Sequence, residues 1–192
     1  MKKTIKLLFI GIAIFFLPSC SYNSLVGLDE GVNKSWADVE AAYQRRADLI
    51  GNLVETVKGE AKFEKETLTA VIEARSKATS IQLKADEITP ENMEKFQQAQ
   101  SQLSGALSRL IAVSENYPNL KATQGFENLM NELEGTENRI NVARRDYNAA
   151  VQSYNTQVRS FPANITANIF GFKTRAPFKA DPGSEKAPKF QF

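Results

Sequence analysis

A single cysteine, Cys20, is the residue of this chain best suited to covalent chemistry. A thiol is the most nucleophilic side chain near neutral pH, but a lone one forms neither an internal disulfide nor a thiolate metal cluster. Cys20 follows the apolar run Leu7–Leu17, which Pro18 ends. This position indicates a thiol that is modified, rather than one that serves catalysis in a folded domain.

The segment ahead of the cysteine has the composition of an export signal. Three lysines, Lys2, Lys3 and Lys6, precede the 11 residues of Leu7–Leu17. A helix needs about 20 apolar residues to span a bilayer, so this run is short. Because positive charges stay in the cytoplasm, we predict that the remainder of the chain lies on the exported side.

The residues around the thiol, Leu17-Pro18-Ser19-Cys20, resemble the lipobox of bacterial lipoproteins. That pattern has Leu three residues before the cysteine and a small residue just before it, although Pro is not the commonest residue at its place. The resemblance implies cleavage before Cys20, a diacylglycerol thioether on its sulfur, and a further acyl chain such as palmitate. The alternative is an uncleaved transmembrane anchor. Either way, lipid on Cys20 or the apolar segment tethers the protein to a membrane.

Missing residue types exclude several kinds of site. The chain has no histidine, the commonest general base and transition-metal ligand. Without the three N-terminal lysines, 21 basic residues face 22 acidic ones, so no bulk charge attracts nucleic acid. Serine, lysine and threonine form no triad and no phosphate-binding loop. We predict no catalytic, cofactor-binding or metal site, and no nucleic-acid partner.

Three charged residues, Arg46, Glu137 and Arg144, occupy positions in apolar helical seams, where charge is costly. One interpretation is a ligand site inside a helical bundle. We prefer a structural one, in which a buried or half-buried ion-pair network fixes the helix register. We predict that Arg46 and Glu137 meet across the first and fourth helices, with Arg144 one heptad further on.

Two other sets of residues invite a functional interpretation. Tyr147-Asn148 and Tyr154-Asn155 repeat at a spacing of seven residues and could present hydroxyls to a ligand. We expect both rings to pack in the seam, with the hydroxyls at its edge. Two groups of glutamates invite comparison with a di-metal carboxylate site. Such a site needs Glu-x-x-His pairs on facing helices, and this chain has no histidine. The glutamates are Glu60, Glu64, Glu66, Glu132, Glu134 and Glu137.

The elements that carry these residues read as helices. From about residue 24 to residue 160, apolar residues recur at spacings of three and four, and no segment alternates with period two. The last of four such seams keeps this spacing for 32 residues, as antiparallel bundles and coiled coils do. It contains Phe126, Met130, Leu133, Glu137, Ile140, Arg144, Tyr147, Val151, Tyr154 and Val158.

Proline and glycine mark the helix boundaries. Thr89-Pro90 fits an N-cap followed by proline at the first helical position, and Asn116–Asn119 separates the third helix from the fourth. A single helix over residues 30–83 would be ~80 Å long and would lack packing partners. We therefore expect a break between Gly51 and Gly59, and predict an all-α fold, an antiparallel four-helix bundle.

The predicted organisation has three parts. Residues 1–19 form the signal or anchor segment, residues 20–172 the bundle domain, and residues 173–192 a flexible tail with three prolines and no periodicity. Within the domain, Ala163–Phe170 is predicted to be a short amphipathic turn. The alternative for the tail is that its aromatic residues anchor a partner. These are Phe178, Phe190 and Phe192.

Several stretches, in order along nearly the whole chain, resemble the LemA family. They are YNSL at 22–25, YQRRADLIGNLVETVKGEAKFEKETL at 43–68, EARS at 73–76, LSRLIAVSENYPNLKA at 107–122, TENRINVARRDYNAAVQSYN at 136–155 and FPANITANIFGF at 161–172. The resemblance implies a membrane-anchored helical bundle on the export side, in a family without a well-established molecular activity. The chain departs from the family pattern at Gly51, Glu60 and Phe63, near the first helix break.

Three functions compete. The first is a non-enzymatic scaffold or interaction module, membrane-anchored on the periplasmic or extracellular side, that binds an unidentified membrane or envelope protein. The second is an envelope hydrolase, which the absence of histidine and of a nucleophile motif disfavours. The third is an interfacial membrane binder that uses Ile165, Ile169, Phe170 and Phe172. Near-zero net charge disfavours this last function, because interfacial helices are usually rich in lysine and arginine.

Overall fold

The computed structural model describes residues 2–60 and 63–179, and for residues 2–20 and Asp86 it describes the backbone only. The chain is all-α, as predicted, and the described residues contain no strand. The helices are α1 (Lys2–Lys58), α2 (Lys65–Ser80), α3 (Pro90–Ser114), α4 (Pro118–Lys121), α5 (Gln124–Arg159) and α6 (Ala163–Phe170), with a 3-10 turn η1 (Ala85–Glu87).

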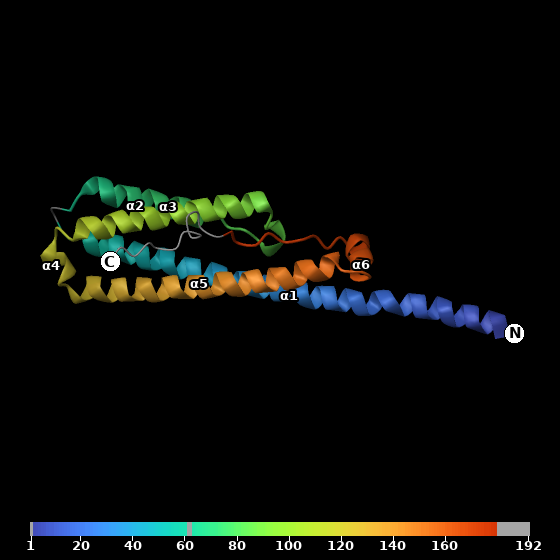
Figure 1. Ribbon diagram of the computed structural model, residues 1–192. Helices are drawn as coiled ribbons and strands as arrows, with labels where there is room; N and C mark the ends of the chain where they lie inside the picture. Colours follow the sequence, from blue (N-terminus) through green and yellow to red (C-terminus); the bar gives the residue numbers. More distant parts are fainter. Residues whose placement is uncertain (1, 61–62, 180–192) are drawn as a thin grey trace, which may run out of the picture.

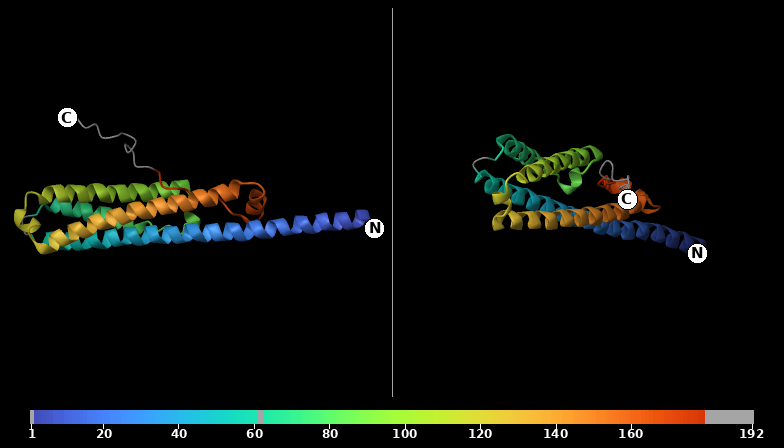
Figure 2. Two further views of the ribbon diagram at one scale, coloured as in Figure 1. Left: turned by 60° about the horizontal axis from the view of Figure 1, so that its bottom comes forward. Right: turned by 60° about the vertical axis from the view of Figure 1, so that its left-hand side comes forward.

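The four long helices α1, α2, α3 and α5 run alternately up and down (Figure 1). α5 packs along α1 and α2 packs along α3, which forms the predicted antiparallel four-helix bundle. α4 links α3 to α5 at one end, and α6 covers the opposite end against α1 and α5 (Figure 2). α1 begins at Lys2 instead of near residue 24, so one continuous helix joins the N-terminal segment to the bundle.

Local side-chain chemistry sets most of the helix boundaries. Thr89 caps α3, since its hydroxyl accepts a hydrogen bond from the Asn92 amide at 3.2 Å. Thr123 caps α5 in the same way, with the Phe126 amide as donor at 3.4 Å. α6 ends at Gly171, whose φ of +78° suits a residue without a Cβ. The predicted cap at Thr89 is therefore present, and the caps at Thr123 and Gly171 are additional ones.

The break between the first two long helices follows Lys58, so Gly51 lies inside α1. A Cβ at Gly51 would stand 3.2 Å from the Arg75 guanidinium of α2. That guanidinium donates from Nε to the Ala47 carbonyl at 2.6 Å. Gly51 therefore allows close approach of Arg75 to α1, and the helix turns back only after Gly59.

Two apolar clusters fill the bundle, one toward the α6 end and one toward the α4 end. The first is centred on Trp36, Phe96 and Tyr147, and the second on Ile50 and Leu103. Arg46 of α1 and Gln100 of α3 are buried polar residues at the level where the two clusters meet. A polar layer therefore divides the core near the middle of the bundle.

The prediction of a flexible tail over residues 173–192 is wrong for residues 173–179. This segment, named here the strap, turns back from α6 and runs in an extended conformation between α3 and α5 (Figure 1). Phe178 is only 5% exposed, because its ring enters the first apolar cluster. Phe178 is therefore a core residue, while Phe190 and Phe192 lie outside the described residues.

Candidate functional site

The predictions for Cys20 and for residues 1–19 concern side chains outside the described part of the structure. The backbone at Cys20 belongs to α1. Among the residues whose side chains are described, no helix is both long enough and apolar enough to cross a membrane.

The polar layer is built around Arg46, whose side chain is 4% exposed. Its Nη1 lies 3.2 Å from both carboxylate oxygens of Glu137 and 3.2 Å from the Ser104 hydroxyl. Its Nη2 donates to Gln100 Oε1 at 2.5 Å, and its guanidinium lies over the Tyr43 ring at 4.9 Å. α1, α3 and α5 each contribute to this layer, so it links three helices at one level.

Burial differs sharply between the two members of the ion pair. The Glu137 side chain is 51% exposed, whereas Arg46 is nearly inaccessible. Arg46 Nε is also buried, and it has no hydrogen-bond partner within the described residues. A buried guanidinium must be neutralised and bonded to be tolerated, so Glu137 and Gln100 together keep Arg46 in the core.

Arg144 belongs to a different set of contacts. The predicted meeting of Arg46 with Glu137 is present, but Arg144 turns toward the strap. Its Nη2 donates to the Lys179 carbonyl at 3.2 Å, and its guanidinium lies 5.0 Å from the centre of the Phe178 ring. The three seam charges therefore divide between a core layer and a contact that holds the strap.

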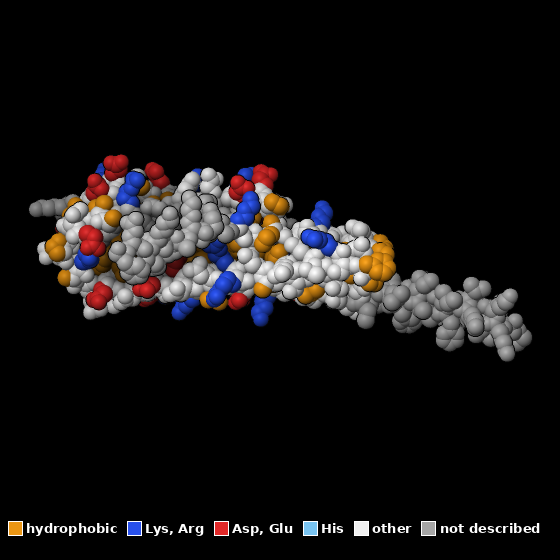
Figure 3. Space-filling model, viewed as in Figure 1, with side chains coloured by type: hydrophobic (Ala, Val, Ile, Leu, Met, Phe, Trp, Pro, Cys, Tyr) orange, Lys and Arg blue, Asp and Glu red, His pale blue; other side chains and the backbone are white. Residues whose placement is uncertain are grey.

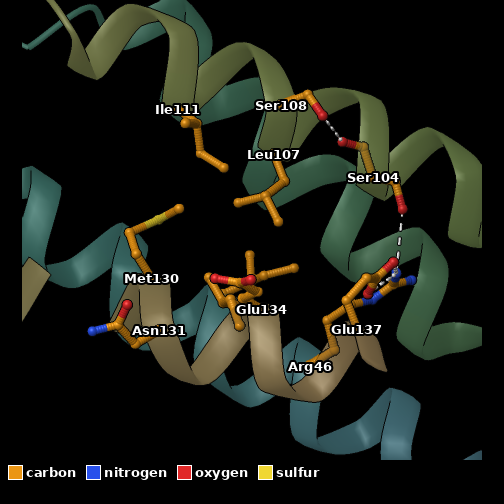
Figure 4. Close-up of a pocket in the computed structure, with 11 residues that line it drawn as sticks. Arg46, Ser104, Leu107, Ser108, Ile111, Met130, Asn131, Glu134 and Glu137 are labelled. Carbon is orange, nitrogen blue, oxygen red and sulfur yellow. Dashed lines mark hydrogen bonds and ion pairs between the residues drawn. The ribbon is translucent and has the colours of Figure 1, made fainter. Parts of the chain in front are cut away.

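A groove, named here the α3–α5 groove, opens on both sides of the Arg46–Glu137 pair. Toward α4 it widens into a cavity of about 300 Å³, into which Leu107, Ile111 and Met130 point (Figure 4). Toward α6 it continues as a more polar cavity of about 250 Å³, lined by Gln97, Ser101 and Arg144 among others. Arg46, Ser104 and Glu137 line both cavities.

The Tyr-Asn repeat binds the strap. The Asn148 amide forms two hydrogen bonds with the backbone of Phe178, accepting from its N–H at 2.8 Å and donating to its carbonyl at 3.3 Å. Asn155 forms the same two bonds with the backbone of Arg175, both at 2.8 Å. The Tyr147 hydroxyl donates to the Ala176 carbonyl at 3.0 Å. The side chains of the repeat therefore form a ladder of hydrogen bonds to the backbone of one extended segment.

Both tyrosines of the repeat are buried, as expected, and burial raises the pKa of Tyr147 and of Tyr154 above the ordinary phenol value. Each phenol therefore stays protonated over the physiological range, and Tyr147 acts as a hydrogen-bond donor to the strap. Arg175 adds an ion pair with Asp29 at 3.0 Å and a hydrogen bond to the Ala85 carbonyl. These contacts fix the strap to α1, η1 and α5.

A second surface with functional potential lies at the α6 end. Tyr22, Phe161, Ile165, Ile169 and Phe170 are exposed there and are named here the α6 patch. Phe161 is 82% exposed and Ile169 is 71% exposed. The Tyr22 ring of α1 lies 4.8 Å from the Phe170 ring, which joins the two helices in one surface. Figure 3 shows hydrophobic side chains gathered at this end.

The glutamates considered for a metal site are dispersed. Glu132 pairs with Arg45 at 2.7 Å, Glu137 pairs with Arg46, and Glu64 accepts a hydrogen bond from the Thr67 hydroxyl at 2.7 Å. Among the described side chains, no group of three or more acidic, cysteine or histidine residues is arranged to hold a metal ion.

Sequence reasoning missed three participants in these sites. The sequence alone does not single out Gln100 or Ser104, and it predicts a flexible tail where the strap lies. The sequence carries a partial signal for the strap, since the Tyr-Asn repeat places two side-chain amides seven residues apart on one face of a helix. A seven-residue repeat of amides on one helix can match an extended backbone, as Asn148 and Asn155 do here.

Comparison with known proteins finds relatives that share most of the chain. The model of the LemA family matches residues 35–192. Magnetosome protein MamQ 2 of Paramagnetospirillum magneticum is 28% identical over 182 residues, which cover 85% of this chain and 66% of that protein. Protein LemA of Metamycoplasma hominis is 26% identical over 174 residues, which cover 91% of this chain and 75% of that protein. The chain spans just under two thirds of the MamQ length, and it belongs to the LemA family.

Proposed function

We propose that this protein is a non-enzymatic scaffold, tethered to a bacterial membrane, whose bundle rests on the membrane by its α6 end and binds another membrane or envelope protein. The observation that carries this proposal is the position of the α6 patch. The patch lies at the end from which α1 continues toward the apolar run Leu7–Leu17. Exposed apolar surface of this kind marks a contact with a membrane or a partner.

The distance along α1 supports the membrane as the contact. Tyr22 is five residues beyond Leu17, which is ~7.5 Å along a helix. The headgroup region on each side of the hydrocarbon core is ~5–7.5 Å thick, so a residue at this distance from the apolar run lies at the headgroup level. Tyr22 contacts Phe170, so the α6 patch lies at that depth when Leu7–Leu17 is in the bilayer. Lipid on Cys20 would place the patch at a similar depth, because Cys20 is only two residues from Tyr22.

The patch acts together with the tether. The acyl chains or the apolar run hold the chain at the membrane, and a second apolar contact beside this tether holds the bundle in one orientation. Tyrosine and phenylalanine suit this level, since aromatic rings favour the membrane interface. Interfacial membrane binding, which the sequence presented as a separate function, is thus one part of how the scaffold attaches to the membrane.

A role without catalysis fits the way the polar groups are used. Arg46 is bonded to Glu137, Gln100 and Ser104, and Tyr147 is bonded to the strap. All of these bonds are made within the chain and stabilise the fold. The names of the relatives, magnetosome protein and protein LemA, mention no reaction. The lysines before Leu7–Leu17 favour the exported side for the bundle.

Vesicle flotation of residues 21–192, which lack the anchor, tests the attachment. We expect a fraction of this protein to float with phosphatidylglycerol–phosphatidylethanolamine vesicles in high salt, since apolar contacts resist salt. The double variant Ile169→Ser, Phe170→Ser should lose this binding. Ile72→Ser is the matched control, because Ile72 is an exposed apolar residue of α2. Equal flotation of all three proteins, or of none, would contradict the proposed orientation.

A further inference from the structure

A hollow of about 530 Å³ lies between α1 and α5 and is lined by residues of these two helices alone. This surface is named here the α1–α5 face, and it is lined by Asp38, Ala41, Ala42, Arg45, Thr136, Asn138, Arg139, Val142, Ala143 and Asp146. We propose that the α1–α5 face is an interface with a second copy of this chain, packed antiparallel to the first. The pairing rests on the charges and the shape of the face, and only its consequence for membranes rests on the proposed function.

The first step is an acidic level on the face. The contact between Arg46 of α1 and Glu137 of α5 fixes which residues of the two antiparallel helices lie side by side. Asp38 is eight residues before Arg46, and Asp146 is nine residues after Glu137. Both aspartates are therefore displaced from this contact by nearly the same distance toward α6, and they lie level with each other.

A basic level lies seven residues further along both helices, which is ~10.5 Å toward α4. It consists of Arg45 on α1 and Arg139 on α5. Arg45 pairs with Glu132 of the same chain, but its side chain is still 56% exposed. Asp38, Arg139 and Asp146 are exposed as well, and none of the three forms an ion pair with another described residue. The face therefore presents charges of opposite sign that are accessible to a partner.

These two levels select one arrangement of two copies. If the copies run in the same direction, the acidic levels meet each other and so do the basic levels. If they run antiparallel, with a two-fold axis across the face midway between the levels, Asp38 meets Arg45 of the second copy and Asp146 meets Arg139 of the second copy. Each of these pairs occurs twice by symmetry. Charge complementarity therefore favours the antiparallel pair, since like charges brought together oppose association.

The centre of the face suits close contact. The axis passes at the level of Ala42 and Val142, whose short side chains allow the helices of two copies to approach. Val142 is 45% exposed, so an apolar side chain stands uncovered at this centre. The same level is near the middle of α5, and nearly the whole helix overlaps its copy. Two helices ~20 Å wide and ~50 Å long offer ~1,000 Å² per copy, and a stable interface needs ~800 Å².

An antiparallel pair carries its two α6 patches at opposite ends. Tyr22 is 20 residues before Ala42, which is ~30 Å along α1, so the two patches stand ~60 Å apart. When each α6 patch rests on a membrane, as proposed above, the pair joins two facing membranes. Two copies anchored side by side in one membrane would instead bring like charges to the same level.

Disulfide trapping in the full chain tests the pairing. In a Cys20→Ser background, Val142→Cys places one thiol beside the two-fold axis, where it meets the same thiol of the second copy. Ile72→Cys on α2 is the matched control, because Ile72 is 43% exposed and Val142 is 45% exposed. In detergent, at no more than one chain per micelle, we expect the disulfide between two chains to form about tenfold faster with Val142→Cys, because pairing raises the effective concentration of the thiols. Equal rates would overturn the proposal and leave the face to a lipid or to a different protein.

Charge exchange supplies the second measurement. Asp146→Arg should slow trapping about tenfold, because it sets an arginine against Arg139 of the second copy, and Arg139→Asp should do the same with two aspartates. A mixture of the two variants should regain the original rate, since each chain then supplies the charge that the other lacks. Arg145→Asp is the matched control, because Arg145 is exposed but lies outside the face, and it should leave the rate unchanged. A mixture that traps no faster than its two components would overturn the pairing.

Vesicle clustering separates the pairing from the proposed attachment. Vesicles that carry the wild-type chain should cluster, as followed by light scattering, and Asp146→Arg should prevent it. Fast trapping with Val142→Cys but no clustering of vesicles would support the pairing and contradict the attachment by the α6 end. Slow trapping in every variant would overturn the pairing, whatever the vesicles do.

Discussion

Replacing Glu137 by alanine removes the carboxylate that neutralises a buried guanidinium. Arg46 is 4% exposed and would keep only Gln100 and Ser104 as hydrogen-bond partners. Breaking a fully buried pair costs ~3–5 kcal/mol, and an exposed pair contributes less than ~1 kcal/mol. Glu137 is 51% exposed, so in the variant water can reach the place of the carboxylate and replace part of the interaction that Arg46 loses. We therefore expect Glu137→Ala to lower the free energy of unfolding by ~1–2 kcal/mol.

A double-mutant cycle isolates the interaction itself. Once Arg46→Met has removed the charge, Glu137→Ala should have almost no further effect, which gives a coupling energy of ~1–2 kcal/mol. The exposed pair Arg45–Glu132 is the control, since its atoms are closer, at 2.7 Å, but both side chains are about half exposed. Its coupling should stay below ~1 kcal/mol. Urea unfolding of residues 21–192, followed by circular dichroism, measures both cycles. Additive effects of Arg46→Met and Glu137→Ala would refute a polar layer that acts as a unit.

Three further predictions concern the strap and the N-terminus. Asn148→Ala should raise amide exchange across residues 173–179 while the exchange of α5 stays slow; unchanged exchange in the strap would mean that the ladder does not hold it. Burial raises the pKa of Tyr147 above its ordinary value of 10.0, so the folded chain keeps the proton that the unfolded chain loses first. Stability should therefore be full below pH ~10 and fall as the pH rises above it, and Tyr147→Phe should weaken this fall in thermal unfolding. Intact mass should show that the wild-type protein begins at Cys20 and carries acyl chains, whereas Cys20→Ser stays uncleaved; a wild-type chain that retains residues 1–19 with a free thiol would contradict the lipobox interpretation.

Local and periodic signals explain how much of the fold was predictable. Apolar residues at spacings of three and four predicted the long helices, and Thr89-Pro90 predicted the start of α3. Seam positions also brought Arg46 and Glu137 to the same level of the bundle, because both fell on faces that point inward. These features depend on a few neighbouring residues, or on a period that one helix preserves over its whole length.

The rest depends on contacts between distant segments. Gly51 offers the same local signal as Gly59, and only the approach of Arg75 from α2 shows why a glycine stands inside the helix there. The strap has no hydrophobic period, since side-chain amides of another helix satisfy its backbone. Prolines and charges near it favour disorder, but the buried ring of Phe178 and the hydrogen bonds from α5 hold the segment in place. Sequence patterns on one segment do not reveal such a partner.

The central claim is that the α6 end of the bundle lies in the membrane interface. The most direct measurement is fluorescence quenching of a nitrobenzoxadiazole label by headgroup spin-labelled lipids, in the full chain in nanodiscs and in a Cys20→Ser background. Ile169→Cys carries the label in the α6 patch, and Asn119→Cys carries it in α4, at the far end of α5, which is ~54 Å long. The account predicts strong quenching at Ile169→Cys and almost none at Asn119→Cys. Weak quenching at both positions, or stronger quenching at Asn119→Cys, would contradict it.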